Sequence, residues 1–541
     1  MRLLFAFATV LLFSACIHQR VDLIVHHAQI YTVNNDFNVA EAMAIQDGKI
    51  VAVGSNDDIL KEYQSDSLVN AHNAIVYPGF IDAHAHFLSY GQSLYTVGLM
   101  FVPNWQEALD RVKAFAVEHP GKGWIKGRGW DQNRFPGKQF PTNAELNLLF
   151  PDRPVILERV DGHACIANDF ALQLAGVKAG QTIEGGQFTT QNGKLTGLLI
   201  DNAVGIVEKQ VPAATNEDYK DWLIAAQQNC FATGLTTITD CGLSPEDVDR
   251  VDALQKSNDL KMRLYVMLSD HPSTYSSKYF TAGGYVTDKL MVKGIKVYGD
   301  GALGSRGACL LQPYADKAGW SGFLRSSPAH FDSIAAKLIA TDFQMCTHAI
   351  GDSANRTILK IYAKYLKGKN DKRWRIEHAQ IINPADFHLF GDNSIVPSVQ
   401  PTHGTSDMYW AAERLGAERL KGGYAFKQLL EQNNWLPLGT DFPVEEINPF
   451  KTFLAAVARQ DAKGFPAGGF QMENVLSREQ TIRGMTIWAA KANRMEKQVG
   501  SIEVGKKADF IILDKDLMKV PSDSILQVKV LKTYLNGERV F

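Results

Sequence analysis

Four histidines, a lysine and an aspartate follow or end short apolar stretches of the chain, and the histidines and the aspartate could bind a metal ion. His84 and His86 end the stretch 78–86, which reads Pro-Gly-Phe-Ile-Asp-Ala-His-Ala-His. Alternate residues of an extended backbone point to the same side, so the two imidazoles can converge on one point. The other four side chains are Lys296, His348, His378 and Asp441. Imidazole and carboxylate groups are ligands that suit Zn²⁺, so the set indicates a metal centre.

Each of these side chains also has a simpler interpretation. A lone pair such as His84 and His86 is equally well explained as two surface histidines. A single histidine at the end of a strand is more often a hydrogen-bonded structural residue, and Thr440-Asp441 alone would usually cap a helix. A lysine inside a buried strand, such as Lys296, is rare without a specific role. The prediction therefore rests on finding all six at strand ends.

The apolar stretches predict short buried strands that alternate with amphipathic helices. The expected strands are 77–81, 155–157, 236–239, 264–268, 294–298, 344–348, 375–378, 395–399 and 436–439. The expected helices are 216–233, 245–257, 331–341, 353–366 and 425–432. Such alternation favours a parallel sheet, and eight units over this length favour an α/β fold of the (β/α)8 TIM-barrel type. A barrel of this type places its active site at the carboxyl ends of its strands.

The two ends of the chain differ from the middle in their predicted secondary structure. Residues 17–76 and 491–541 contain short strands and hairpin turns, such as Asp47-Gly48 between two apolar runs. They predict a small β-sandwich domain formed from both termini, with the barrel over 77–490. Residues from about 90 to 220 follow the first barrel strand and predict a large insertion over the mouth of the barrel.

The first 16 residues predict a signal peptide. An apolar run from Leu3 to Phe13 is too short to span a bilayer, and Ser14-Ala15-Cys16 resembles the lipobox of bacterial lipoproteins. We expect a protein of the cell envelope that is anchored through a lipid on Cys16, preferably to the outer membrane on its periplasmic side. An ordinary secretory signal is the alternative, and it predicts a periplasmic or secreted protein.

The overall composition is that of a globular protein with a large core. The chain has 541 residues, 45% of them hydrophobic and 21% charged, with a net charge of −2. This balance gives no indication of binding to nucleic acid or to an anionic membrane surface. Five cysteines follow Cys16 at long spacings without a CxxC pair, and they predict mostly buried free thiols.

The motifs together resemble the amidohydrolase superfamily, and most of all the amidohydrolase-3 branch that includes N-substituted formamide deformylases. The resemblance extends from about Val21 to Phe541. The matching segments are PGFIDAHAHF (78–87), DGHACIAN (161–168), IKVYGDGALGSR (295–306), THAIGDSA (347–354), RIEHAQ (375–380), QPTHGTSDMYW (400–410), GTDFPVE (439–445) and GKKADFIILD (505–514).

The resemblance implies a role for each candidate ligand. His84 and His86 would bind a buried metal, and His348 and His378 would bind a second one. Lys296, which the alignment selects over Lys293, would bridge the two metals as a carbamate. Asp441 would bind metal and act as the general base. The cofactor would be one or two Zn²⁺ ions or another divalent metal.

The reaction implied is hydrolysis of a carbon–nitrogen bond other than a peptide bond, in an amide, an N-substituted formamide or a cyclic amide. The substrate would be a small molecule, and a homodimer is possible. The alternatives are deamination or ester hydrolysis at the same site, or a metal-binding lipoprotein without turnover.

A second group of residues is predicted to surround the substrate. His163, His403 and Trp130 are expected to bind it, and Asp407 and Trp410 to line the pocket. A structural polar contact explains His163 equally well, and packing explains the tryptophans equally well. Asp300 is expected to hold Lys296 or a metal ligand by a hydrogen bond.

Overall fold

The computed structural model describes residues 18–100, 102–159, 164–183, 186–201, 203–304 and 306–541. The predicted signal peptide, the lipobox Cys16 and His163 lie outside the described residues. The chain divides into two compact units. The first contains the residues up to His86, Gln228–Asp249 and Lys261–Phe541, and the second contains Phe87–Gln227 and Arg250–Leu260.

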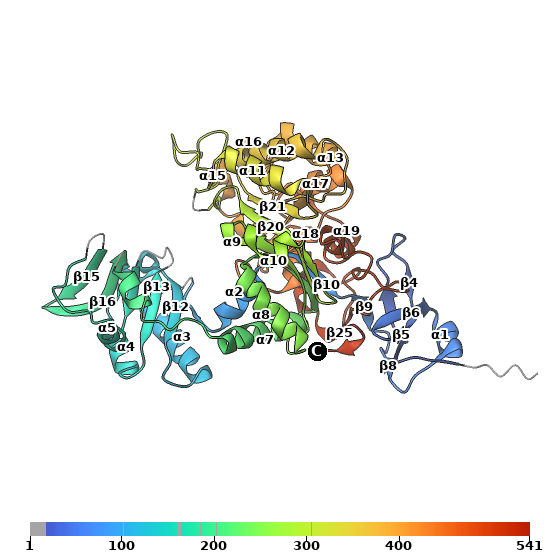
Figure 1. Ribbon diagram of the computed structural model, residues 1–541, viewed down its shortest axis with the longest axis horizontal. Coiled ribbons are helices and arrows are strands. Elements are labelled where there is room, and N and C mark those ends of the chain that lie inside the picture. The colour runs from blue at the N-terminus through green and yellow to red at the C-terminus, as the bar shows by residue number, and fades with distance from the viewer. Residues whose placement is uncertain (1–17, 101, 160–163, 184–185, 202, 305) are drawn as a thin grey trace, which may run out of the picture. The chain divides into compact units, whose positions relative to one another are not determined.

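A ring of parallel strands forms the centre of the first unit (Figure 1). Each strand is hydrogen-bonded to the next in chain order, as expected when helices connect successive parallel strands. The strands are β10 (Phe80–Ala85), β17 (Leu235–Leu243), β18 (Arg263–Ser269), β20 (Leu290–Tyr298), β21 (Gln344–Ala349), β22 (Arg375–His378) and β23 (Val396–Ser398). The short β19 (Tyr285–Val286) pairs antiparallel with β20.

An extended segment at 436–440 takes the eighth place in this ring. On one side Gly439 N donates to Val399 O (3.0 Å), next to β23. On the other side Ala83 N of β10 donates to Leu438 O (3.2 Å), and Asp441 N donates to His84 O (2.8 Å). The backbone hydrogen bonds therefore continue around the ring, and the predicted TIM-type barrel is confirmed.

The first predicted strand, 77–81, is in fact divided between two sheets. β9 (Ile75–Pro78) pairs with strands from the chain ends, whereas β10 belongs to the barrel. Gly79 lies at the transition, where a Cβ would approach Thr236 Oγ1 to 2.3 Å, so a larger residue would not fit without movement. As a correction to the predicted boundary, His84 lies inside a barrel strand and not after it.

Residues 155–157, predicted as a strand within the range of the insertion, do form a strand. They belong to β13 (Val155–Arg159), which lies in a separate six-stranded sheet of the second unit. The other strands of that sheet are β11 (Val97–Gly98), β12 (Ile125–Trp130), β14 (Ala164–Ala167), β15 (Gly186–Gln191) and β16 (Lys194–Asp201). A three-residue apolar run fits any buried strand, so it does not identify the sheet to which it belongs.

Two further sheets of the first unit contain strands from the chain ends. The four-stranded sheet has the order β6-β5-β2-β8 and the six-stranded sheet the order β26-β25-β24-β9-β3-β4. A common apolar cluster includes Val25 and Ile45 from the first sheet and Ile30, Val76 and Phe510 from the second. The strands are β2 (Leu23–His26), β3 (Gln29–Tyr31), β4 (Val39–Ala40), β5 (Ala42–Gln46), β6 (Lys49–Gly54), β8 (Leu68–Asn70), β24 (Phe510–Leu513), β25 (Val530–Leu535) and β26 (Glu538–Arg539).

The five predicted helices are confirmed within a few residues at their ends. They are α7 (Asn216–Ala232), α8 (Pro245–Lys256), α11 (Pro328–Leu338), α12 (Asp352–Leu366) and α17 (Phe426–Asn433). Other helices of the first unit are α1 (Asn56–Glu62), α9 (Pro272–Ser276), α10 (Lys278–Thr281), α13 (His388–Asp392), α14 (Pro401–Asp407), α15 (Ala411–Leu415), α16 (Ala417–Leu420), α18 (Pro449–Ala458), α19 (Arg478–Gly484) and α20 (Ile487–Ala492). The second unit adds α2 (Phe87–Leu94), α3 (Trp105–Glu118), α4 (Ala144–Leu149), α5 (Asp169–Leu174) and α6 (Val204–Glu208).

The expectation for the cysteines can be compared with the described part of the chain. All five cysteines after Cys16 are free thiols, and all but Cys309 are buried. Among the described helices, none combines the length and apolar character needed to cross a bilayer.

Candidate metal centre

The six candidate ligands gather at the carboxyl end of the barrel. His84, Lys296, His348 and His378 come from β10, β20, β21 and β22, and His86 follows β10 directly. Asp441 follows the segment that closes the ring. All except His84 line a pocket of about 370 Å³, and His84 itself is fully buried.

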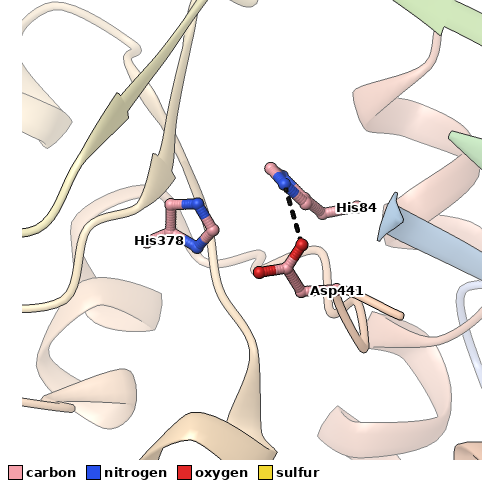
Figure 2. Close-up of side chains that lie close together, drawn as sticks. All are labelled: His84, His378 and Asp441. Carbon is pink, nitrogen blue, oxygen red and sulfur yellow. Dashed lines mark ion pairs between the residues drawn. The ribbon is translucent and has the colours of Figure 1, made fainter. Parts of the chain in front are cut away.

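Three of these residues form a compact set of possible metal ligands. One ligand atom each from His84, His378 and Asp441 lies within 4.8 Å of the other two. Figure 2 shows His84 and Asp441 pointing toward one another, with the ring of His378 across from them. His84 Nε2 is 3.5 Å and His86 Nε2 is 3.2 Å from Asp441 Oδ1. These distances allow several of these side chains to share a bound ion.

The backbone is unusual at two of these residues. His378 has φ of 73° and Asp441 has φ of 66°, both in the left-handed region that residues other than glycine rarely adopt. Each such residue costs about 1–3 kcal/mol and persists only where the surroundings impose it. Both residues lie at the ends of barrel segments, and such a backbone is typical of a functional site.

A buried ion pair orients His84. His84 Nδ1 lies 2.5 Å from Glu377 Oε2, and Arg375 Nε lies 2.7 Å from Glu377 Oε1. Burial alone would raise the pKa of Glu377, but Arg375 and His84 hold it at about 2, so this side chain is a carboxylate. A carboxylate only accepts, so His84 carries its proton on Nδ1 and presents the lone pair of Nε2 to the centre.

Gln400 orients His378 in the same way. His378 Nδ1 lies 2.7 Å from the amide oxygen of Gln400, whose amide nitrogen donates to Ser398 O. The proton of His378 therefore lies on Nδ1, and the lone pair of Nε2 is available.

Two ring nitrogens of the centre have no hydrogen-bond partner among the described residues. His348 Nε2 and His403 Nε2 are buried without a hydrogen bond, which is costly for a folded protein. Burial and the nearby Lys296 lower the pKa of His84 to about 4 and that of His348 to about 3.

Asp441 is ionised, whereas the lowered pKa values leave His84 and His348 neutral. Burial alone would raise its pKa, but the hydrogen bond from His86 holds it well below its usual range. Neutral imidazoles around an ionised carboxylate fit a divalent cation.

Lys296 points to the centre and Lys293 does not. Lys296 is almost fully buried, and its Nζ lies 3.2 Å from His84 Nε2. Lys293 Nζ donates to Gly283 O at 2.6 Å. The structure thus places the lysine that the alignment selects, and not its neighbour three residues away, beside the histidines.

Asp82 and Thr440 bind the closing segment to β10. Thr440 Oγ1 donates to Asp82 Oδ2 at 2.7 Å, and His84 N donates to Asp82 Oδ1 at 3.0 Å. Thr440-Asp441 therefore does not act as a helix cap, the simpler interpretation of this pair. Asp300 likewise joins two segments of the chain. It accepts the backbone N–H groups of Ile350 and Gly351, which follow β21, and it lies 3.6 Å from His348 Nε2.

Of the described residues that were predicted to surround the substrate, some lie at the pocket and one does not. His403, on α14, lies 3.5 Å from Asp441 Oδ2, and Trp410 and Asp407 line the pocket. Trp130 instead is fully buried in the core of the second unit, where its Nε1 donates to Leu157 O at 2.7 Å. It has no exposed surface to offer a substrate, so packing, the alternative interpretation, accounts for it.

Sequence reasoning missed the residues that orient the ligands. Glu377, Arg375 and Gln400 were not identified as functional. A usable signal was present, because Arg375 and Glu377 alternate within a strand predicted to be buried on both faces. Two charged groups on one face of such a strand must find partners inside the barrel.

The chain was compared with known proteins. Residues 67–541 match the model of the amidohydrolase family. "Protein LONG AFTER FAR-RED 3" of Arabidopsis thaliana is 34% identical over 96% of this chain and 91% of its own. The N-substituted formamide deformylase of Arthrobacter pascens is 25% identical over 96% of this chain and 98% of its own.

Solved structures give the same result. The crystal structure of an uncharacterized metal-dependent hydrolase from Pyrococcus horikoshii OT3 superimposes with a TM-score of 0.77 and 27% identity, over 92% of this chain and 99% of that one. The match extends over the barrel and the segments that carry the candidate ligands, so this chain belongs to the amidohydrolase family, as the motifs of its sequence predict.

Proposed function

We propose that the protein is a metal-dependent hydrolase that uses water to cleave a carbon–nitrogen bond other than a peptide bond. The observation that supports this most is the buried set of neutral histidines around the ionised Asp441 at the base of a pocket. The similarity to an N-substituted formamide deformylase favours an amide, an N-substituted formamide or a cyclic amide as substrate.

The residues of this chain supply most of the chemistry. His84, His86, His348, His378 and Asp441 would hold the metal. Once bound, a divalent ion would lower the pKa of a water from 15.7 toward about 7 and polarise the scissile carbonyl. Asp441 takes the proton of the attacking water and returns it to the leaving nitrogen. His403 Nε2, which is buried and unpartnered beside Asp441, is positioned to bind the substrate at the same point.

A panel of small molecules tests the reaction type. We expect release of a carboxylic acid, or of formate, together with an amine from an amide or a formamide. Release of ammonia from a ring would indicate deamination, and turnover of esters alone would indicate an esterase. No turnover on any of these compounds, by protein that contains its metal, would contradict the proposed function.

We also propose that the centre holds two zinc ions bridged by a carbamate on Lys296. In support, Lys296 is buried beside His84, and Lys296 has no ion-pair partner within the described residues. For protein grown with zinc and bicarbonate, elemental analysis should find two metal equivalents per chain. Lys296→Met should keep at most one, because a methionine cannot form a carbamate.

A matched control lies on the same strand. Lys293→Met should keep both equivalents, since Lys293 contacts Gly283 and not the histidines. One equivalent in the unmodified protein would make Lys296 a positioning residue of a single-metal site. Two equivalents in Lys296→Met would reject the carbamate bridge.

Two features of the architecture belong to the same proposal. The two sheets that share an apolar cluster form a β-sandwich built from both chain ends. Residues from about 90 to 220 are an insertion after the first barrel strand. The separate sheet within this range supports an insertion with a core of its own.

We further propose that the protein is anchored in the cell envelope through a lipid on Cys16. The lipobox-like Ser14-Ala15-Cys16 after a short apolar run supports this. Cys16→Ala should move the protein from the membrane fraction to the soluble fraction of lysed cells. A Cys309→Ala variant, which changes another cysteine, should stay with the membranes. If Cys16→Ala still fractionates with membrane lipid, the anchor is elsewhere.

A further inference from the structure

One carboxylate of the pocket wall, Asp407, is held in place through only one of its two oxygens. Asp407 Oδ2 accepts hydrogen bonds from Tyr424 Oη (2.8 Å) and from Gln380 Nε2 (3.1 Å). Tyr424 and Gln380 are themselves buried, and Gln380 also donates to Tyr424 Oη, so the three side chains form a fixed network. Oδ1 of Asp407 has no hydrogen bond within the described part of the chain. Because Asp407 lines the pocket, Oδ1 is available to a bound molecule.

The distance from Asp407 to the reacting centre follows from helix geometry. His403 and Asp407 lie four residues apart on α14, so their side chains are on the same face, about 6 Å apart along the axis. His403 Nε2 lies 3.5 Å from Asp441 Oδ2. A substrate whose scissile bond is at Asp441 therefore reaches Asp407 with a group about one helical turn away.

Carboxyl groups are the acidic part of this wall. Apart from the candidate metal ligands, the carboxyl side chains of the described lining are Asp407 and Glu445, and no arginine lines the pocket. Burial raises the pKa of Asp407, whereas the nearby His403 and the hydrogen bond from Tyr424 lower it. Glu445 is already engaged, since its Oε1 accepts from Ser406 Oγ at 2.7 Å. The remaining wall is largely apolar and includes Leu303, Ile350 and Trp410. Asp407 is thus a carboxylate that a buried network holds in place, with Oδ1 left for a bound molecule beside a largely apolar part of the wall.

We propose that Asp407 binds a second, positively charged nitrogen of the substrate, so that the substrate class is an amide or formamide with an amino group about 6 Å from the scissile bond. This inference rests on the proposed function, because it places the scissile bond at Asp441. An alkyl group at the same place would remove water from Asp407 without replacing its hydrogen bonds. A site built around such a hydrogen bond discriminates strongly against the analogue that lacks it, and we expect at least a tenfold difference.

Binding of two isosteric probes tests the proposal without any need for turnover. The probes are 4-aminobutanehydroxamate and pentanehydroxamate, which share a metal-binding head and differ only in a terminal amine or methyl group. Calorimetry on the protein with its metal should find the amino probe bound about 10- to 100-fold more tightly. This comparison needs no variant, so a folding defect cannot obscure it.

Variants then assign the effect to one side chain. Asp407→Asn should remove the preference, and Tyr424→Phe, which leaves the carboxylate but removes one of its two donors, should reduce it. Glu445→Gln should keep the preference. Equal affinities in the unmodified protein, an undiminished preference in Asp407→Asn, or its loss in Glu445→Gln would each overturn the proposal.

The outcome is separable from that of the proposed function. A preference for the amino probe in a protein that hydrolyses nothing would keep the assignment of Asp407 and reject the hydrolase. Hydrolysis of alkyl amides without any preference for the amine would keep the hydrolase and reject the assignment of Asp407. Where turnover is seen, Asp407→Asn should raise KM for amino-substituted amides and leave kcat nearly unchanged, since Asp407 does not contact the scissile bond.

Discussion

Asp441→Asn is expected to lower turnover by about 10²- to 10⁴-fold while the protein keeps its metal. The amide has nearly the same shape as the carboxylate and still offers one oxygen to the centre. It cannot take up the proton of the attacking water, which is the step assigned to Asp441. The measurements are kcat on the best amide of the panel and metal content by elemental analysis.

A control on the same loop separates this loss from a general change of charge. Glu446→Gln removes a carboxylate five residues away that pairs with Lys451 at the surface. It should leave both turnover and metal content unchanged. Near-normal turnover in Asp441→Asn would reject Asp441 as the base, and combined loss of turnover and metal would assign it a ligand role only.

The barrel could be predicted from sequence because its strands are buried on both faces. Runs such as 264–268 are apolar throughout, and the helices between the strands have clear amphipathic patterns. The same property leaves open the sheet to which a strand belongs. The predicted strand 155–157 is part of β13, and its place in a separate sheet depends on the strands with which it pairs.

The position of Gly79 shows a second limit of prediction from the sequence. β9 and β10 are separated by one residue, yet they pair in different sheets. A sequence pattern identifies an apolar extended segment, but it does not reveal that the hydrogen-bonding partners change at one glycine.

The candidate ligands could be predicted from the sequence, but the residues that orient them could not. Histidine, lysine and aspartate at strand ends have a recognisable chemistry, and the structure brings all six together. Their orientation depends on contacts across the barrel, such as that of His84 on β10 with Glu377 on β22. Those contacts join residues 293 positions apart, and no local pattern encodes them.

Glu377→Gln is expected to affect stability and metal binding together. Glu377 accepts from His84 and pairs with Arg375, and all three side chains are fully buried. A glutamine has one acceptor oxygen and would turn its NH₂ group toward one of these donors. The charge of Arg375 would then be buried without its partner, which costs about 3–5 kcal/mol. His84 would also lose the contact that fixes its tautomer, and metal affinity should fall about 10- to 100-fold.

The two effects are measured separately because a bound metal itself stabilises the fold. Urea unfolding of metal-free protein gives the change in the free energy of unfolding, and competition with a chelator gives the metal affinity. Glu418→Gln makes the same substitution in an exposed pair with Lys421 and should change neither quantity. If Glu377→Gln weakens metal binding but leaves the metal-free protein equally stable, the Arg375–Glu377 pair serves only to orient His84. If metal affinity is unchanged, His84 does not depend on Glu377 for its orientation, and the arrangement proposed for the centre is wrong at that residue.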